Sequence, residues 1–440
     1  MSIIARMVSA LQQLFGPLAD EAGRQAGVIR RRRKFTPLSL ARTFVLGHLQ
    51  NPRPTDEQQA QIAVQADADV TPQAVAQRKT SHLVGFLEGL FRKASAVVVA
   101  SNRALAPLLE RFTSVTVLDS TTITVPEELA ERFPGCGGRH GSGVAAMKLQ
   151  TELDLRHGSL SHIEIEPGRS PDGASSRQQA SRPVGSLRIT DLGYFCLATF
   201  AAMVAGGAHF LTRLQFGTGV MLGNGTGIDL LTWLPQQAGP YIDVEILLGL
   251  GERLPCRLLA WRLPAEQANR RRQKLRQERL KKCKPAPSAE RLAWCDWTIL
   301  VTSVAAEKLT PPEAVVLYRA RWQIELLFKR WKSQDLVAVL SGSTAVEQMV
   351  GVWSRLLAAL VQHWLVVTSA WGDARRSWVK VSEAVRAFVV RLLSALDDAA
   401  ALGKVLSDLC RVVSKTCGRN KRSKPGTVEL LNNISLLDFG

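Results

Sequence analysis

The hydrophobic pattern changes its period near Ser114, and this change limits the folds that the chain can adopt. Before it, in residues 1–108, apolar residues recur at helical spacing. After it, Val115, Val117 and Ile123 alternate with threonine and serine, which is the period of a half-buried strand. A helical region followed by strands and further helices predicts a protein of the mixed α/β class.

The region after Ser114 predicts three strands, a helix, a strand, a helix and a strand. Strands after the first are predicted at residues 147–155, 160–165, 186–190 and 209–216, and a helix is predicted at 195–205. The stretch 170–182 is polar, turn-rich and partly helical in pattern, and His157-Gly158 is typical of a hairpin turn. In this order Asp119 ends the first strand and Asp191 ends the fourth.

The remaining segments complete a five-part organisation. We expect an N-terminal helical domain (1–108), an α/β core in two parts (109–216 and 296–345), a mostly β insertion with a basic helix (217–295) and a C-terminal helical region (346–440). Within the insertion, strands are predicted at 244–250 and 256–263 and the basic helix at 267–284. A strand at 297–302 and one long helix from Pro311 or Pro312 to about Ser333 follow.

The charge balance favours a polyanionic partner. With 56 Lys and Arg against 38 Asp and Glu, the net charge is 56 − 38 = +18. Nucleic acid is the first candidate and an anionic membrane surface the second. Leu192–Thr212 lacks charged residues, but its glycines and His209 favour a buried helix and strand over a membrane span. The odd number of cysteines, 7, without a CxxC pair, fits a reducing cytoplasm.

The segment 317–332 carries the most specific pattern. On a helical wheel of roughly 100° per residue, Tyr318, Arg321, Glu325 and Lys332 fall within an arc of about 60°. The adjacent arc is apolar and consists of Leu317, Ile324, Leu327, Phe328 and Trp331. The apolar stripe is therefore expected to pack in a core, and the stripe with Tyr318, Arg321, Glu325 and Lys332 is expected to line a site. An ordinary salt bridge between Arg321 and Glu325 is the simpler alternative, although it leaves Tyr318 and Lys332 unexplained.

These four residues resemble the Tyr-Arg-Glu-Lys signature of the DDE transposases of bacterial insertion sequences, in the family named after insertion sequence four. Trp322 after the arginine is also as in that family. Asp119-Ser120-Thr121 resembles the motif of its first aspartate, and Asp191-Leu192-Gly193-Tyr194, with Arg213 on the next strand, resembles that of its second. The resemblance covers about 115–335. It implies an RNase H-like mixed sheet flanked by helices, and a catalytic triad of Asp119, Asp191 and Glu325.

The resemblance also implies the chemistry. Three carboxylates suit hard divalent cations, so the expected cofactor is Mg²⁺, with Mn²⁺ as a substitute, and Asp119, Asp191 and Glu325 are the expected ligands. Two ions about 4 Å apart activate the attacking oxygen of a phosphodiester reaction and stabilise the leaving one. Singly, Asp119 could be a strand-end turn residue and Asp191 a helix cap. The histidines lack ligand spacing, and none is assigned to metal.

The implied substrate is double-stranded DNA, both as transposon ends and as target. We expect a dimer on paired ends, no membrane association, and a bacterial cytoplasmic protein at the nucleoid. Two alternatives remain: an RNase H-like nuclease that cuts DNA without strand transfer, and a non-enzymatic DNA-binding regulator built on the N-terminal helices. An intact catalytic triad argues against a non-enzymatic regulator. A strand-transfer assay distinguishes a transposase from a nuclease that only cuts DNA.

Further DNA contacts are expected outside the triad. Phosphate contacts are expected from Arg31, Arg32 and Arg33, and base contacts from Gln73, Gln77 and Arg78, on a helix that Thr71 caps; an ordinary surface helix is the alternative. Tyr318, Arg321, Lys332, Trp322 and Arg213 are expected at the DNA beside the triad. In hairpin-forming members of the family a tryptophan before the signature helix stacks on a flipped base, and Trp297 has a similar position, although it could be a core residue. The basic helix is expected to follow the DNA backbone, with a merely solvated helix as the alternative. Arg139 and His140 lie in a glycine-rich loop, which either contacts DNA or has no role in binding.

Overall fold

The computed structural model describes residues 2–29, 34–137, 144–334, 342–420 and 425–437. The chain forms two units. The first comprises Met1–Leu105, Asp119–Ser170 and Gln323–Ser423, and the second comprises Ala106–Leu118, Pro171–Trp322 and Lys424–Gly440. Strand β1 (Val115–Thr124) therefore begins in the second unit and ends in the first.

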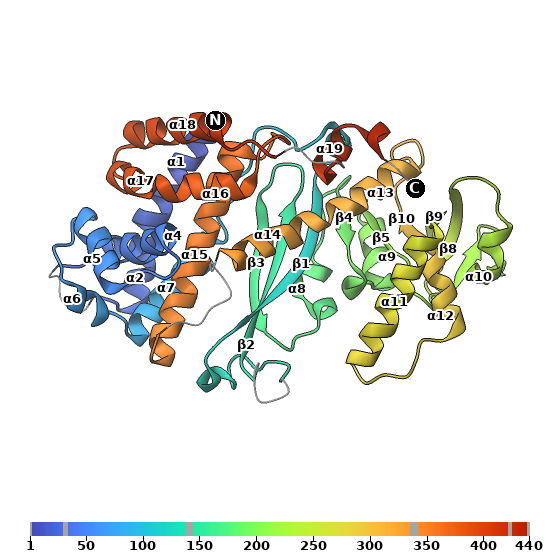
Figure 1. Ribbon diagram of the computed structural model, residues 1–440, viewed down its shortest axis with the longest axis horizontal. Helices are drawn as coiled ribbons and strands as arrows, with labels where there is room; N and C mark the ends of the chain where they lie inside the picture. The colour runs from blue at the N-terminus through green and yellow to red at the C-terminus, as the bar shows by residue number, and fades with distance from the viewer. Residues whose placement is uncertain (1, 30–33, 138–143, 335–341, 421–424, 438–440) are drawn as a thin grey trace. The chain divides into compact units, whose positions relative to one another are not determined.

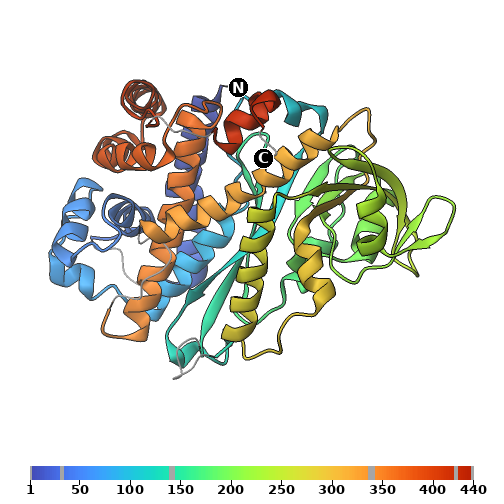
Figure 2. The same cartoon turned by 45° about the vertical axis from the view of Figure 1, so that its right-hand side comes forward.

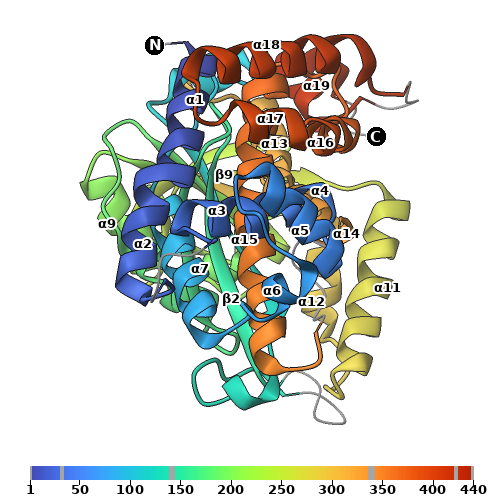
Figure 3. The ribbon, with the colours of Figure 1, turned by 90° about the vertical axis from the view of Figure 1, so that its left-hand side faces the viewer.

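The first unit is mainly helical. Its helices are α1 (Ile3–Gln13), α2 (Ala19–Ala26), α3 (Pro37–Ala41), α4 (Gly47–Gln50), α5 (Asp56–Gln65), α6 (Pro72–Ala76), α7 (Ser81–Ala94), α14 (Trp322–Ser333), α15 (Ala345–Ala370), α16 (Trp378–Ala387), α17 (Val389–Ala395) and α18 (Ala399–Thr416). Helix α15 is the core element, and Figure 3 shows it in orange among the blue N-terminal and red C-terminal helices. The rings of Phe91 on α7 and Trp353 on α15 have centroids 5.7 Å apart. Helices from both ends of the chain thus share one apolar core.

The first unit also contains the hairpin of β2 (Ala146–Asp154) and β3 (Leu160–Pro167), which pair antiparallel as predicted. At its turn Gly158 has a φ of +75°, and a Cβ atom there would lie 2.3 Å from the ring of Trp371. Only glycine fits this backbone conformation and this close approach. The Gly158 carbonyl accepts a hydrogen bond of 2.7 Å from Nε2 of buried His363, which joins the hairpin to α15.

The second unit contains most of the sheet. Its strands after β1 are β4 (Leu187–Thr190), β5 (His209–Arg213), β6 (Val220–Leu222), β7 (Gly227–Ile228), β8 (Ile242–Leu248), β9 (Leu254–Arg262) and β10 (Trp297–Thr302). Its helices are α8 (Ser176–Gln179), α9 (Leu197–Ala205), α10 (Leu230–Trp233), α11 (Ala265–Lys281), α12 (Ala289–Ala293), α13 (Pro311–Ala320) and α19 (Thr427–Asn432). The ten strands are ordered β3-β2-β1-β4-β5-β10-β9-β8-β6-β7 (Figure 1). Strands β1, β4 and β5 run parallel, and β10 runs antiparallel to β5, so the predicted mixed α/β class is confirmed.

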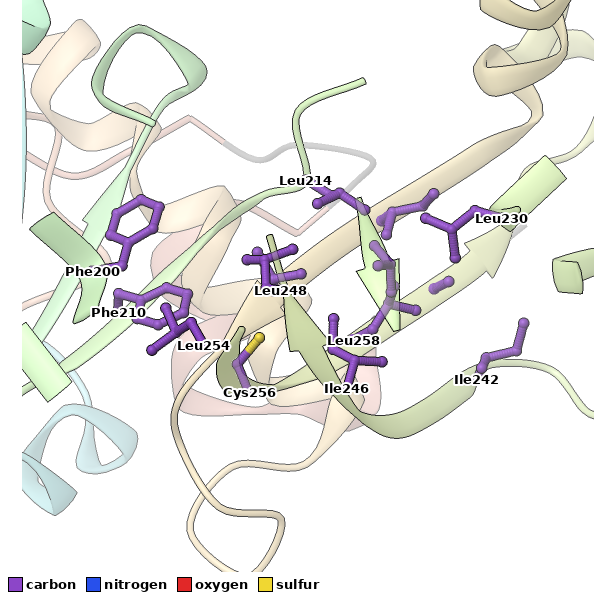
Figure 4. Close-up of a cluster of buried hydrophobic side chains, with 14 of the residues drawn as sticks. Phe200, Phe210, Leu214, Leu230, Ile242, Ile246, Leu248, Leu254, Cys256 and Leu258 are labelled. Atoms are coloured by element: carbon purple, nitrogen blue, oxygen red, sulfur yellow. The ribbon is translucent and has the colours of Figure 1, made fainter. Parts of the chain in front are cut away.

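The strands of the predicted insertion extend this sheet. Strand β9 pairs with β10 along the whole of β10, and β8 pairs with β9. Figure 4 shows their side chains in one apolar cluster with Phe200 of α9 and Phe210 of β5, whose rings stack at 4.6 Å. The segment 217–295, predicted as mostly β with a basic helix, contains the strands β6 to β9 but also the helices α10, α11 and α12, of which α11 alone has 17 residues. It shares a hydrophobic core with the neighbouring strand β5.

The uncharged run at Leu192–Thr212 forms a helix and a strand, α9 and β5, as expected. Among the described residues, one helix, α15, is long and apolar enough to cross a membrane by length and composition. Its most apolar stretch is entirely buried within the protein, which is the property of a core helix.

Two predicted elements differ from the observed ones. The single helix expected from Pro311 to about Ser333 is two helices, α13 and α14, which meet at Arg321. Arg321 itself keeps helical dihedral angles, and its backbone N–H donates to the Tyr318 carbonyl, three residues earlier. Asp119 does not end its strand but lies in the middle of the ten-residue β1, because the alternating pattern continues to Thr124.

Candidate active site

The two aspartates follow one parallel strand pair. Val115 pairs with Leu187 and Val117 pairs with Ile189, a constant offset along β1 and β4. Asp119 and Asp191 are each two residues beyond the last pair, Val117 and Ile189. Both aspartates are half-buried, Asp119 in the middle of β1 and Asp191 directly after the last residue of β4.

Asp191 is held by contacts within the second unit. It precedes a short 3₁₀ turn, Leu192–Tyr194, but its side chain makes no capping hydrogen bond. The turn is fixed instead by buried Gln178 of α8, whose amide donates to the Tyr194 carbonyl over 2.7 Å. The Asp191 carboxylate accepts a hydrogen bond from the Tyr318 hydroxyl, 3.4 Å from oxygen to oxygen. The simpler interpretation, in which Asp191 caps a helix, is therefore not supported, because the capping hydrogen bond is absent.

Tyr318 is at the centre of a group of cations. The guanidinium carbon of Arg213 lies 5.6 Å from the centroid of the Tyr318 ring, and that of Arg321 lies 5.9 Å from it. Burial raises the pKa of Tyr318 to about 12, with Arg213 opposing the rise and Asp191 adding to it. The phenol is consequently protonated at neutral pH and remains a donor to Asp191.

The start of α13 fixes where Tyr318 lies. Pro311 and Pro312 occupy its first turn, where the missing N–H costs no helical hydrogen bond. The carboxylate of Glu313 accepts a hydrogen bond of 2.8 Å from the backbone N–H of Thr310 and one of 2.9 Å from Nη1 of Arg111. These contacts hold the first turn of α13, two turns before Tyr318.

Glu325 and Lys332 lie on α14, in the first unit. The predicted apolar stripe is confirmed, since Leu317, Ile324, Leu327, Phe328 and Trp331 are all buried. Glu325 is half-buried and Lys332 is exposed. Trp322, the first residue of α14, is 50% exposed, which is high for such a large apolar side chain.

Trp297 opens β10, as predicted, and is half-buried against the apolar cluster of Figure 4. Its carbonyl accepts a hydrogen bond of 2.9 Å from Nη1 of Arg271 on α11, and Arg271 Nη2 donates to the Thr298 hydroxyl over 3.0 Å. The sequence did not predict that Arg271 binds the carbonyl of Trp297 or that Gln178 binds the carbonyl of Tyr194. Arg271 is one of many cations in its segment, and local pattern cannot single out the one that turns inward.

The described N-terminal candidates, Gln73, Gln77 and Arg78, belong to the first unit. Thr71 caps α6 as predicted, by accepting from the backbone N–H of Ala74. The helix is only five residues long, however, because Gln77 ends it. Gln73 and Gln77 are exposed, and the Arg78 guanidinium lies 5.5 Å from the centroid of the Phe35 ring. The candidates Arg31, Arg32, Arg33, Arg139 and His140 lie outside the described residues.

The donor chemistry of the triad suits a hard divalent cation. Asp119, Asp191 and Glu325 offer carboxylate oxygens, each half-buried. They belong to different units, Asp191 to the second and the other two to the first. In the described part of the chain, no group of three His, Cys, Asp or Glu side chains is gathered closely enough to hold a metal ion.

Comparison with known proteins identifies the family. Residues 110–351, more than half of the chain, match the model described as the Transposase DDE domain. The chain belongs to this family. It is 26% identical over 346 residues to the transposase for insertion sequence element IS231B of Bacillus thuringiensis subsp. berliner, covering 71% of this chain and 70% of that one. It is 28% identical to the IS231C transposase of the same organism (72% and 70% covered) and 27% identical to the IS1151 transposase of Clostridium perfringens (68% and 66% covered).

Membership confirms the resemblance to DDE transposases of insertion sequences. The chain is a transposase, an enzyme that acts on DNA and depends on a divalent metal. The observed mixed sheet with its helices is consistent with the RNase H-like fold expected for this family. A non-enzymatic regulator is correspondingly disfavoured as the function of the chain.

Proposed function

We propose that this transposase binds the terminal inverted repeats of an insertion sequence, cleaves the DNA at the element ends and joins the freed ends to a target. The observation that carries the proposal is the match of residues 110–351 to the Transposase DDE domain, because Asp119 and Asp191 both lie within the matched residues. Glu325 completes the set of carboxylates in the proposal.

The three carboxylates would hold Mg²⁺, for which Mn²⁺ would substitute. When bound, the ions lower the pKa of an attacking water or hydroxyl and stabilise charge on the leaving oxygen. The residues of the chain supply the positioning. Asp191, hydrogen-bonded to Tyr318, keeps one orientation of its carboxylate, and a fixed ligand needs less reorganisation when the phosphodiester arrives.

The cations beside Asp191 would bind the DNA strand. Arg213 and Arg321 both lie over the Tyr318 ring, whose hydroxyl donates to the Asp191 carboxylate. Their excess positive charge suits a phosphate of the scissile strand, which guanidinium groups bind through paired N–H donors. Lys332 and exposed Trp322 would contact the same DNA from α14.

Trp297 would stabilise a bent DNA end by stacking on an unpaired base, if the element uses a hairpin intermediate. A base leaving the stack costs a few kcal/mol, which an aromatic ring partly offsets. The Arg271 hydrogen bonds to β10 support this role, because they hold the backbone on which Trp297 sits. The packing of Trp297 against the apolar cluster supports a structural role as well.

The N-terminal helices would recognise the inverted repeat, with Gln73 and Gln77 toward the bases and the basic stretch at Arg31, Arg32 and Arg33 toward phosphates. Because α7 packs against α15, this region is best tested in the full chain rather than as a fragment. Replacement of Gln73 and Gln77 by alanine should reduce the preference for the element end over random duplex, and leave affinity for random duplex nearly unchanged. An unchanged preference would place recognition elsewhere.

The deciding experiment for the function is a strand-transfer assay. Purified protein is incubated with Mg²⁺, a duplex carrying the element end with a free 3′-hydroxyl, and a plasmid target. Covalent joining of the end to the plasmid supports a transposase that completes the reaction. Cleavage of the end without any joining would favour the nuclease alternative. Size measurement of the complex on paired ends tests the proposed dimer.

A further inference from the structure

Helix α11 has a charge that nothing in the active site uses. Its 17 residues contain seven Lys or Arg and two Glu, so its net charge is 7 − 2 = +5, against +18 for the whole chain. A single helix therefore holds more than a quarter of the excess charge of the protein. Figure 2 shows it as a long yellow helix in the second unit.

One side of α11 is fixed to the protein. Ala268 is buried, and Arg271 donates to the Trp297 carbonyl and the Thr298 hydroxyl of β10. Arg272 forms an ion pair with Asp296 and donates to the Leu292 carbonyl over 3.2 Å. The two half-buried arginines thus attach the helix to the start of β10, so the other cations are presented by an anchored helix.

Most of the remaining cations face solvent, whereas half-buried Arg279 donates to the Pro285 carbonyl. We call Arg270, Lys274, Arg276, Lys281 and Lys282, all exposed, the α11 basic surface. Arg270 pairs with Glu266, and Lys274 lies 3.9 Å from Glu278, but all four side chains are more than half exposed. Exposed pairs of this kind contribute at most about 1 kcal/mol, so both cations can exchange their partner for a phosphate.

The shape and chemistry of this surface suit a DNA duplex. From Arg270 to Lys281 the helix rises roughly 16 Å at about 1.5 Å per residue, which corresponds to about five base pairs at about 3.4 Å each. A membrane-binding helix would need an apolar face next to the cations, and here the exposed large apolar residue is Leu280 alone among those described on α11. A merely solvated helix would carry more balanced charges.

The surface is joined to the candidate active site within the second unit. Arg271 donates a hydrogen bond to the carbonyl of Trp297, the first residue of β10. Leu300 of the same strand pairs with Arg213 of β5. The pKa of Arg271 is lowered by burial and by the nearby charge of Arg213, which is the arginine over the Tyr318 ring. The anchored side of α11 therefore lies near Arg213, within the same unit.

We propose that the α11 basic surface binds the phosphate backbone of target DNA. This rests on the proposed function, in which the enzyme holds an element end and a target. Lys and Arg on an open surface contact phosphates and carry no sequence information. That property suits a target taken without a fixed sequence, whereas element ends must be distinguished by their bases.

The test uses the full-length protein with four substitutions, Lys274→Gln, Arg276→Gln, Lys281→Gln and Lys282→Gln. The matched control carries Arg103→Gln, Arg169→Gln, Arg253→Gln and Lys404→Gln, which are exposed, lie elsewhere and change the net charge equally. Both proteins are compared with the parent in thermal unfolding, in cleavage of a duplex with the element end, in joining of a pre-cleaved end to plasmid, and in binding of random duplex at several salt concentrations.

We expect the α11 variant to cleave ends within about twofold of the parent, but to join them to plasmid roughly tenfold more slowly at 0.15 M salt. Its salt slope for random duplex should fall by about three to four, from four lost phosphate contacts at about 0.9 each. The control variant should show a much smaller decrease in both the rate of joining and the salt slope for random duplex.

Three outcomes would overturn the proposal. Equal loss of end cleavage and joining would show that α11 holds the element end, no loss in any assay would show a solvated helix, and equal losses in the control would show an effect of net charge alone. Failure of the proposed function differs from failure of the α11 proposal, because in the first case the parent protein itself would not join ends to plasmid. The binding of random duplex would then still test whether α11 is a DNA-binding surface.

Discussion

The hydroxyl of Tyr318 donates a hydrogen bond to Oδ1 of Asp191 across 3.4 Å, although 127 positions separate the two residues in the sequence. The contact joins the first residue after β4 to helix α13. It links one proposed metal ligand to one residue of the Tyr-Arg-Glu-Lys signature. The phenol remains protonated, since its pKa is raised to about 12.

Tyr318→Phe removes this donor and keeps the ring. A hydrogen bond to a charged group contributes about 1.5–3 kcal/mol, so we expect end cleavage to slow by roughly tenfold or more, with little change in DNA affinity. Initial rates with the element end and Mg²⁺ measure the effect. Tyr241→Phe, at an exposed tyrosine of the insertion, is the control. A Tyr318→Phe protein as active as the parent would remove the Tyr318–Asp191 contact from the mechanism.

Each carboxylate of the triad should be essential for chemistry. Asp119→Ala, Asp191→Ala and Glu325→Ala are each expected to abolish cleavage and joining and to leave DNA binding largely intact, because affinity comes from Lys and Arg while the carboxylates hold the metal. Gel-shift and cleavage assays on the same preparations separate the two effects. Full cleavage by any one of the three proteins with Mg²⁺ would exclude that residue from the triad.

Replacement of Trp297 should separate two steps of the reaction. We expect Trp297→Ala to nick the DNA but to form little hairpin, because the flipped base loses its stacking partner. Trp294→Ala is the matched control, since Trp294 packs against the same apolar cluster. A gel that separates nicked, hairpin and resolved ends gives the readout. Normal hairpin yield from folded Trp297→Ala protein would exclude stacking, and loss of nicking in both variants would indicate a structural role.

The stability of the first unit should fall in mild acid. Burial lowers the pKa of His48 and of His363 to about 3 from an ordinary 6.5, with smaller effects of Arg355 on His48 and of Arg330 on His363. Each imidazole is neutral in the folded protein, and its ring nitrogen pairs with a backbone carbonyl at 2.7 Å. Below pH 6.5 the unfolded chain takes up protons that the folded chain does not, so stability is fully present above pH 6.5 and declines toward pH 3.

Between pH 7.5 and pH 5.0 we therefore expect a loss of about 1–2 kcal/mol in unfolding free energy for each of the two histidines. Urea unfolding at the two pH values measures it. His363→Gln should reduce the difference between the two pH values, whereas His82→Gln, at an exposed position, should leave it unchanged. Equal pH dependence in all three proteins would show that these buried histidines do not control acid stability.

Local pattern was sufficient for most elements. Alternation and turn residues predicted the β2–β3 hairpin at Gly158 and the strand Trp297–Thr302, because both depend on neighbours in sequence. The apolar stripe from Leu317 to Trp331 followed from helical period alone and is buried. Periodicity did not reveal the break at Arg321, since the apolar spacing continues through it and Arg321 keeps helical dihedral angles.

The sequence by itself determined the residue types: two aspartates after apolar strand residues, the Tyr-Arg-Glu-Lys spacing, and a strongly basic segment in the insertion. The tertiary structure decided which of them interact. It set the pairing of Val117 with Ile189, the hydrogen bond of Tyr318 to Asp191, and the inward turn of Arg271 to β10. The physical reason is that spacing governs contacts within one element, whereas strand register and hydrogen bonds between distant residues arise only when the elements pack around a shared core.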